Sequence, residues 1–268
     1  MPDHMPAASD DDHASLARIG LVGAGRMARA LARGWGKPIL CTDAGSGRGA
    51  ALAGEVGGEV AASNADLAAR ADLVVLCHKP AQLAAVADEV DGVARAVVSI
   101  LSGVTVAQLH DVYRRSPVVR LTVNLPIEVR AGVISWPRGQ DIDERLEHSI
   151  VALFAELGTL VRIPEEQVPG VIALAGVGPA LLSVFAEAQS DAAIHAGLPA
   201  ELATMLCTQT MRGTAALLAA RGHDTLAVRR AVASPGGPTT RSLAALEASG
   251  LRHAVLASSL AAQRLPSQ

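Results

Sequence analysis

The fold is decided by the stretch Gly20-Leu21-Val22-Gly23-Ala24-Gly25-Arg26-Met27-Ala28, which follows a short apolar run and opens a helical pattern. Two glycines and a small residue at this spacing are the fingerprint of a dinucleotide-binding turn. Gly23 permits the tight turn, Gly25 lets the backbone approach a pyrophosphate, and Ala28 keeps the helix close to the sheet. Unpaired N–H groups at the helix N-terminus would face the phosphates. The cofactor-binding residues predicted from this turn are Gly20, Gly23, Ala24, Gly25, Arg26 and Met27.

Outward from this turn, short apolar runs alternate with helical patterns up to about residue 100. The predicted strands are Ile19–Val22, Ile39–Thr42, Leu73–Cys77 and Val97–Ile100. Such alternation is typical of βαβ units and a parallel sheet. Two further strand-like runs, Val118–Val123 and Gly132–Trp136, are expected to extend this sheet, and a helix over Ile142–Leu157 precedes a short run at Leu160–Ile163.

From Pro164 onward, Ala- and Leu-rich helical periodicity replaces the strand pattern, with breaks at Gly197–Pro199, Arg221–His223 and Ser234–Pro238. We therefore predict an α/β chain of two domains. Residues 18–163 form a Rossmann-type dinucleotide-binding domain, and residues 164–268 form an all-α substrate and dimerisation domain. Residues 1–17 are predicted to be a disordered tail, because they are acidic and polar at their start.

Asp43 bears on which dinucleotide is bound. It ends the second predicted strand, 20 residues after Gly23, where an acid commonly accepts hydrogen bonds from the ribose 2′-hydroxyl. This position favours NADH. The following Ser46-Gly47-Arg48 could instead hold a 2′-phosphate, so NADPH and NADH both stay open.

Composition limits the classes of partner and compartment. The net charge of −3 and the aromatic content of 2% give neither a positive field nor stacking platforms, so nucleic acid is not an expected partner. Cys41, Cys77 and Cys207 lack CxxC spacing, which predicts neither a disulfide framework nor a metal site. Together with an N-terminus that has no signal-peptide pattern, this predicts a cytoplasmic protein.

The uncharged run Val168–Ala186 approaches the length of a membrane span. Pro and Gly residues interrupt it and its flanks are acidic, which argues against a spanning helix. We expect no membrane association and interpret the run as a helix buried between domains or subunits. With the apolar helix Leu202–Leu218, it predicts a homodimer or higher homo-oligomer.

Three motifs, in order, make the interpretation more specific. Asp72–Pro80 is an apolar strand that runs into Cys-His-Lys-Pro, Ala175–Ala180 reads Ala-Gly-Val-Gly-Pro-Ala, and Ala233–Arg241 reads Ala-Ser-Pro-Gly-Gly-Pro-Thr-Thr-Arg. With Gly197-Leu198-Pro199 and Gln209-Thr210 at matching spacing, the chain from Arg18 to Leu265 resembles the pyrroline-5-carboxylate reductases, whose corresponding signatures are "SGSGPA" and "SPGGTT".

The resemblance implies NAD(P)H-dependent reduction of a cyclic imine, pyrroline-5-carboxylate, to proline. Thr239 would be the hydroxyl nearest the ring nitrogen, and the backbone of the Gly236–Thr239 turn would hold the substrate carboxylate. The implied catalytic residues are Thr239, Lys79 and His78. The implied further cofactor-binding residues are Asn64, Cys77, His78, Lys79, Pro80, Leu101 and Ser102. The implied substrate-binding residues are Asn124, Glu165, Val177, Gly236, Gly237, Pro238 and Thr239.

The departures from the family pattern lie at the substrate end. Ala175 and Val177 replace serines, Leu181 replaces a tyrosine, and His78 replaces the valine before Lys-Pro. Lost hydroxyls make the pocket more apolar, which leaves two alternatives open: an imine reductase for a larger, less polar ring, or a dinucleotide sensor without turnover. A β-hydroxyacid dehydrogenase is disfavoured, because that chemistry needs a lysine beyond the domain boundary and the chain has none there.

Overall fold

The computed structural model describes residues 16–263, so residues 1–15, on which most of the predicted tail falls, lie outside the described residues. The chain forms two compact units that meet in sequence between Gly176 and Val177. Each unit is described by itself.

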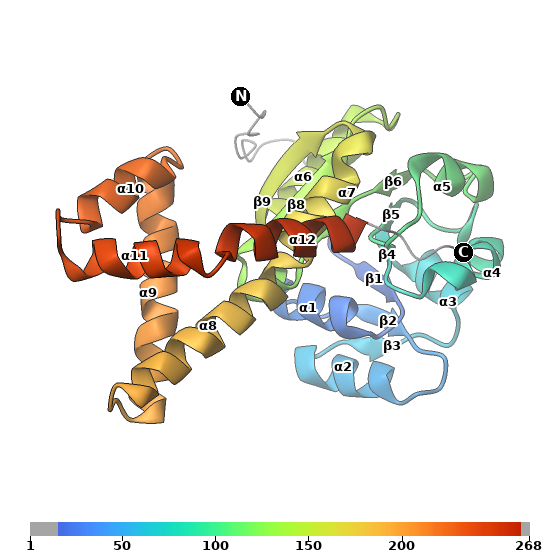
Figure 1. The fold of residues 1–268 in the computed structure, drawn as a ribbon. Coiled ribbons are helices and arrows are strands. Elements are labelled where there is room, and N and C mark those ends of the chain that lie inside the picture. Colours follow the sequence, from blue (N-terminus) through green and yellow to red (C-terminus); the bar gives the residue numbers. More distant parts are fainter. Residues whose placement is uncertain (1–15, 264–268) are drawn as a thin grey trace. The chain divides into compact units, whose positions relative to one another are not determined.

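The first unit is built on a parallel sheet (Figure 1). Its strands, β1 (Ile19–Val22), β2 (Leu40–Thr42), β3 (Glu59–Val60), β4 (Leu73–Leu76), β5 (Val97–Ser99) and β6 (Val118–Arg120), lie in the order β3-β2-β1-β4-β5-β6. The helices between them are α1 (Arg26–Trp35), α2 (Arg48–Val56), α3 (Asn64–Arg70), α4 (Leu83–Val90) and α5 (Val106–Val112). The strand order reverses between β1 and β4, which opens a crevice at their carboxyl ends. The predicted Rossmann-type domain is thus confirmed.

The expectation that Val118–Val123 and Gly132–Trp136 extend this sheet is confirmed only for Val118–Arg120, which is β6. Strands β7 (Thr122–Val123), β8 (Gly132–Pro137) and β9 (Gly158–Ile163) form a separate three-stranded sheet, with α6 (Glu144–Ala155) between β8 and β9. The backbone N–H of Leu121 still donates to Ser99 at the end of β5, but Thr122 already pairs with Ser135 in the antiparallel direction. Apolar periodicity marks a run as a strand without identifying its partner, so the sequence predicts one strand where the structure has two, in different sheets.

Both faces of the parallel sheet are buried. Along β4, Leu73 and Val75 join a core with residues of α1, α2 and α6, whereas Val74 and Leu76 join a second core with residues of α3 and α4. Strands buried on both faces read as continuous apolar runs, which is why they are visible in the sequence. Trp35 is one of two tryptophans in the first core, where its indole N–H donates to the carbonyl of Leu153 at 3.0 Å.

Beyond β9 the chain is helical. A short 3₁₀ turn at Glu165–Gln167 leads into α7 (Val168–Val171) and a π-helical turn at Ile172–Gly176, labelled η4. The second unit contains α8 (Gly178–His195), α9 (Ala200–Ala220), α10 (Thr225–Val232), α11 (Pro238–Ala248) and α12 (Leu251–Gln263). Its described residues contain helices and no strand, which confirms the predicted all-α C-terminal domain.

The helical run Glu165–His195 has the length and apolar composition of a membrane span. Only 11% of its most apolar window is buried within the single chain. Core helices of other proteins pass the same test of length and composition, so this run shows only that an apolar surface is left uncovered.

Gly34 gives a test of the packing between α1 and the segments that flank the strands of the smaller sheet. A Cβ at Gly34 would overlap the carbonyl oxygen of Ile127 and lie 2.7 Å from Cδ2 of Leu157. We expect Gly34→Ala to lower the free energy of unfolding by about 1–3 kcal/mol, because overpacking outweighs the gain in helix propensity. Thermal or urea unfolding followed by circular dichroism measures the change.

Gly54, in the interior of α2, is the matched control because a Cβ there would meet no atom within 4 Å. Gly54→Ala should raise the free energy of unfolding by about 0.5–1 kcal/mol. If the two variants have equal free energies of unfolding, α1 does not lie as close to Ile127 as described.

Candidate functional site

The turn between β1 and α1 has the backbone that a dinucleotide needs. Gly23 has φ +100°, and a Cβ there would lie 3.1 Å from the backbone of Cys77 and His78 at the end of β4. Gly25 is the N-cap of α1, and a Cβ there would meet no atom within 4 Å. Ala28 is fully buried against the sheet. Open space in front of a helix N-terminus fits a pyrophosphate group.

The other residues predicted from this turn lie beside it, with different surroundings. Ala24 is buried, whereas Arg26 at the start of α1 is exposed. Gly20 lies inside β1, where a Cβ would come within 2.5 Å of Cδ2 of Leu67. The absence of a side chain at Gly20 therefore allows α3 to pack closely on the sheet.

Asp43 lies at the carboxyl end of β2, in a loop that fixes its side chain. The Ser46 hydroxyl lies 2.8 and 2.9 Å from its two carboxylate oxygens, and the backbone N–H of Gly49 donates to it at 3.2 Å. Hydrogen bonding by Ser46 lowers the pKa of the Asp43 carboxyl, so it is ionised at neutral pH. Arg48 donates from Nε to the Ser46 hydroxyl oxygen at 2.6 Å.

The end of β4 carries four predicted cofactor residues. The N–H of Cys77 donates to the carbonyl of Val22, and burial raises the pKa of the Cys77 thiol. His78 is half-buried, with Nδ1 2.9 Å from the carbonyl oxygen of Lys79. Lys79 and Pro80 are exposed, and Pro80 begins the 3₁₀ turn η1 (Pro80–Gln82).

A cavity of about 210 Å³ brings four predicted residues together: Gly23, Asp43, Asn64 and His78. Four further polar side chains line this cavity and were missed by sequence reasoning: Thr42, Ser63, Gln82 and Glu89. Gln82 and Glu89 lie on helical segments outside any motif, so no sequence signal marks them. Because the cavity lies where the strand order reverses, its position is that of a dinucleotide site in an α/β sheet.

Several predicted residues lie outside the lining of this cavity. Leu101 is buried in the core on the α3–α4 face of the sheet, and Ser102 is exposed beyond β5. Asn124 donates from Nδ2 to the carbonyl of Ala175 at 3.0 Å and accepts from the N–H of Val133 at 2.8 Å. Its amide therefore ties the π-helical turn to β8.

Glu165 is also engaged within the first unit. Its Oε1 accepts from Nη1 of Arg120 at 2.6 Å and from the N–H of Val106 at 2.9 Å. The Arg120 side chain is only 6% exposed, so this ion pair is partly shielded from water. Glu165 thus fixes the start of the helical run to β6 and α5.

In the second unit, the turn before α11 is held by its own hydrogen bonds. Gly236 has φ +70°, and Gly237 is the N-cap of the helix. The Thr240 hydroxyl donates to the carbonyl of Ser234 at 2.7 Å, and Arg241 donates to the carbonyl of Gly236 at 2.7 Å. Pro238 and Thr239 follow Gly237 in the first turn of α11. This is a preorganised helix N-terminus suited to a carboxylate, and Val177 caps the start of α8 in the same unit.

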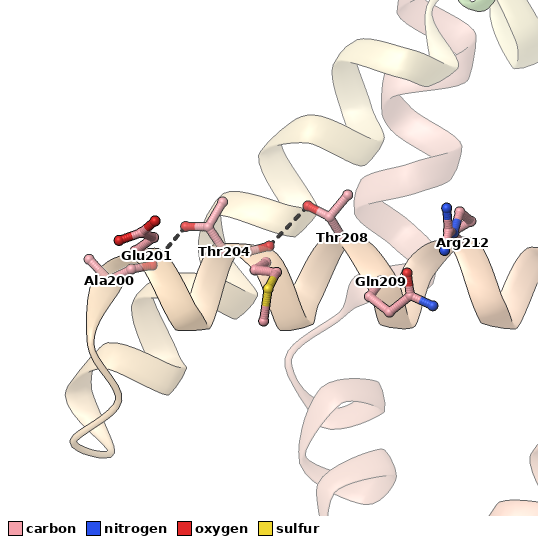
Figure 2. A pocket seen from close by; sticks show the side chains of 7 residues that line it. Ala200, Glu201, Thr204, Thr208, Gln209 and Arg212 are labelled. Carbon is pink, nitrogen blue, oxygen red and sulfur yellow. Dashed lines mark hydrogen bonds between the residues drawn. The ribbon is translucent and has the colours of Figure 1, made fainter. Parts of the chain in front are cut away.

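A hollow of about 680 Å³ lies along one face of α9 (Figure 2). All of its lining residues belong to that helix, among them Thr204 and Thr208, whose hydroxyls donate to the carbonyls of Ala200 and Thr204. A groove formed by a single helix face encloses no reactive group. No metal-binding group of His, Cys, Asp and Glu occurs within residues 16–263.

The family models match both units. The model described as pyrroline-5-carboxylate reductase dimerisation matches residues 165–265. The model described as NADP oxidoreductase, coenzyme F420-dependent, matches residues 18–103.

Individual relatives cover nearly the whole chain. Pyrroline-5-carboxylate reductase 3 of Macaca fascicularis is 34% identical over 89% of this chain and 91% of its own length. Pyrroline-5-carboxylate reductase of Mycobacterium tuberculosis is 32% identical over 92% of this chain and 95% of its own length. Among solved structures, a pyrroline-5-carboxylate reductase from Coxiella burnetii is 27% identical with a TM-score of 0.79, covering 93% of this chain and 97% of that one. The chain therefore belongs to the pyrroline-5-carboxylate reductase family.

Proposed function

We propose that this protein reduces pyrroline-5-carboxylate to proline with NADH or NADPH. The observation that carries the proposal is the family membership over nearly the full length, combined with an intact glycine turn that opens into free space at Gly25. The measurement that tests it is NAD(P)H oxidation by the purified protein with a panel of cyclic imines, with and without a carboxylate.

The bound nicotinamide supplies a hydride, and the residues of the chain position the acceptor. A cyclic imine is protonated near neutral pH, so its ring carbon accepts hydride without a strong acid from the protein. Most of the rate enhancement then comes from orientation and from the exclusion of water. Gly23, Gly25 and the end of β4 would hold the dinucleotide in this role.

At the substrate end, we propose that the Gly236–Thr239 turn binds the carboxylate and that Thr239 hydrogen-bonds the ring nitrogen. Pro238 lacks an N–H, so the donors would come from the other residues of the turn. Lys79 and His78 are proposed to act beside the nicotinamide. Asn124 and Glu165 would act by positioning, because each is bound to neighbouring backbone or side chain.

The replacements at Ala175, Val177 and Leu181 favour a second candidate activity, reduction of a larger and less polar cyclic imine. Apolar side chains cannot reproduce the hydrogen bonds that serine or tyrosine gives to a small polar acid. A preference for imines without a carboxylate in the panel would support this candidate over pyrroline-5-carboxylate.

We also propose that the protein is a cytoplasmic homodimer or higher homo-oligomer, with the all-α domain beginning at residue 164 as the dimerisation domain. No membrane or nucleic acid is part of this proposal. The support is the uncovered apolar surface of the second unit, where Val184 is 64% exposed and Met205 is 58% exposed. Such side chains are normally covered in a symmetric interface.

Replacing Gly25 tests the cofactor turn. We expect Gly25→Val to weaken NADH and NADPH binding by at least about 100-fold, because a branched side chain would occupy the space of the pyrophosphate. Dinucleotide titration followed by nicotinamide fluorescence measures it. The space around Gly25 is open in the folded chain, so the melting temperature should change little. Unchanged binding would show that the fingerprint has been misread.

Replacing Thr239 tests the substrate end. We expect Thr239→Ala to lower turnover of pyrroline-5-carboxylate by roughly 10- to 1000-fold, if the hydroxyl bonds the ring nitrogen chiefly in the transition state. Thr239→Ser keeps the hydroxyl and should retain most of the turnover. Dinucleotide affinity should be the same in both variants. Equal turnover of Thr239→Ala and the parent on every imine would exclude this role.

Replacing Val184 tests the assembly. The parent should be a dimer or larger at micromolar concentration in light scattering, and Val184→Glu should lower the mass, because symmetry places the new charge twice in one apolar interface. Val93→Glu is the matched control, since Val93 is 44% exposed in the first unit. A monomeric parent, or an equal effect of both variants, would contradict the proposed interface.

A further inference from the structure

The cavity at the ends of β1, β2 and β4 has a one-sided charge pattern. Two carboxylates line it, Asp43 from the end of β2 and Glu89 from α4. Neither lysine nor arginine occurs among its described lining residues. The cavity therefore presents hydrogen-bond acceptors and negative charge.

The side chains around Glu89 hold its carboxylate at this cavity. Asn64 donates from Nδ2 to Oε1 of Glu89 at 3.1 Å. The same Asn64 accepts through Oδ1 from the Thr42 hydroxyl at 2.7 Å. Because Thr42 ends β2, this row of hydrogen bonds connects the sheet to α4 and fixes the acceptor beside the cavity.

Two basic groups lie near the carboxylates: His78 lines the cavity, and Arg48 stabilises ionised Asp43 from outside the cavity lining. Burial lowers the pKa of the His78 ring, which favours the neutral form. Since the carbonyl of Lys79 can only accept, Nδ1 of His78 carries the proton, and Nε2 is unprotonated, buried and without a hydrogen-bond partner among the described residues. Arg48 is directed to Ser46, whose hydroxyl donates in turn to Asp43.

We propose that this cavity selects the dinucleotide without a 2′-phosphate, NADH, and that Glu89 acts with Asp43 as a specificity-determining residue. The proposal rests on the proposed function only in that the chain binds NADH or NADPH. The hydroxyls of an unmodified ribose are donors that match the acceptors of the cavity. A 2′-phosphate would instead bring roughly −1.5 to −2 charge beside two carboxylates, and such like-charge contacts discriminate strongly.

The test measures dinucleotide binding by the full-length protein without any imine. Nicotinamide fluorescence gives the Kd of NADH and of NADPH for the parent, Glu89→Gln and Asp88→Asn. The parent should bind NADH at least about 10-fold more tightly than NADPH. Glu89→Gln keeps an oxygen acceptor for Asn64. It should reduce the preference for NADH over NADPH several-fold, mainly because NADPH binds more tightly. Asp88→Asn, an exposed change of equal charge on the same helix and outside the cavity, should leave this preference unchanged.

Equal or tighter binding of NADPH by the parent would overturn the proposal. The proposal would also be overturned if Glu89→Gln and Asp88→Asn had the same ratio of NADPH to NADH Kd values. Circular dichroism must show that both variants are folded. Because no imine is present, the result is separate from the proposed reaction. A protein that binds NADH selectively but does not reduce pyrroline-5-carboxylate would refute the function and retain this inference.

Discussion

The close backbone contact between Gly23 and the end of β4 is the constraint on which the cofactor site depends. With φ +100° and only 3.1 Å between a Cβ position and the backbone of Cys77, no other residue type fits this turn without displacing β4. The contact lies where the strand order reverses, so the same turn fixes the start of α1 and the neighbouring ends of β2 and β4. The side chains of Asp43, Asn64 and His78 gather at one cavity as a consequence.

The parts of the fold that the sequence predicts are those in which local pattern and burial agree. The strand Leu73–Leu76 is buried on both faces, so its continuous apolar run is unambiguous. The separate sheet of β7, β8 and β9 could not be predicted, because pairing partners depend on the path of the chain through space. The same reason hides Gln82 and Glu89, which line the cavity from helical segments that carry no motif.

The candidate residues taken from family resemblance show a second limit. A resemblance places Asn124 and Glu165 near a site, but it does not reveal what their polar atoms bind. In the structure, Asn124 accepts from Val133 and donates to Ala175, and Glu165 pairs with Arg120. Hydrogen bonds between segments far apart in the sequence hold those segments together. Both residues anchor the start of the long helical run to the α/β unit.

The hydrogen bond from Asn124 to Ala175 shows that the departures from the family pattern change side chains and leave the backbone support in place. Asn124 binds the backbone carbonyl of residue 175, so this hydrogen bond exists whether that residue is alanine or serine. The carbonyl lies in the π-helical turn Ile172–Gly176, and such turns occur frequently at functional sites. Replacement of serines by Ala175 and Val177 thus alters the side chains offered to a ligand while the backbone path into α8 keeps its anchor. The fold tolerates these replacements because its support at this point comes from the main chain.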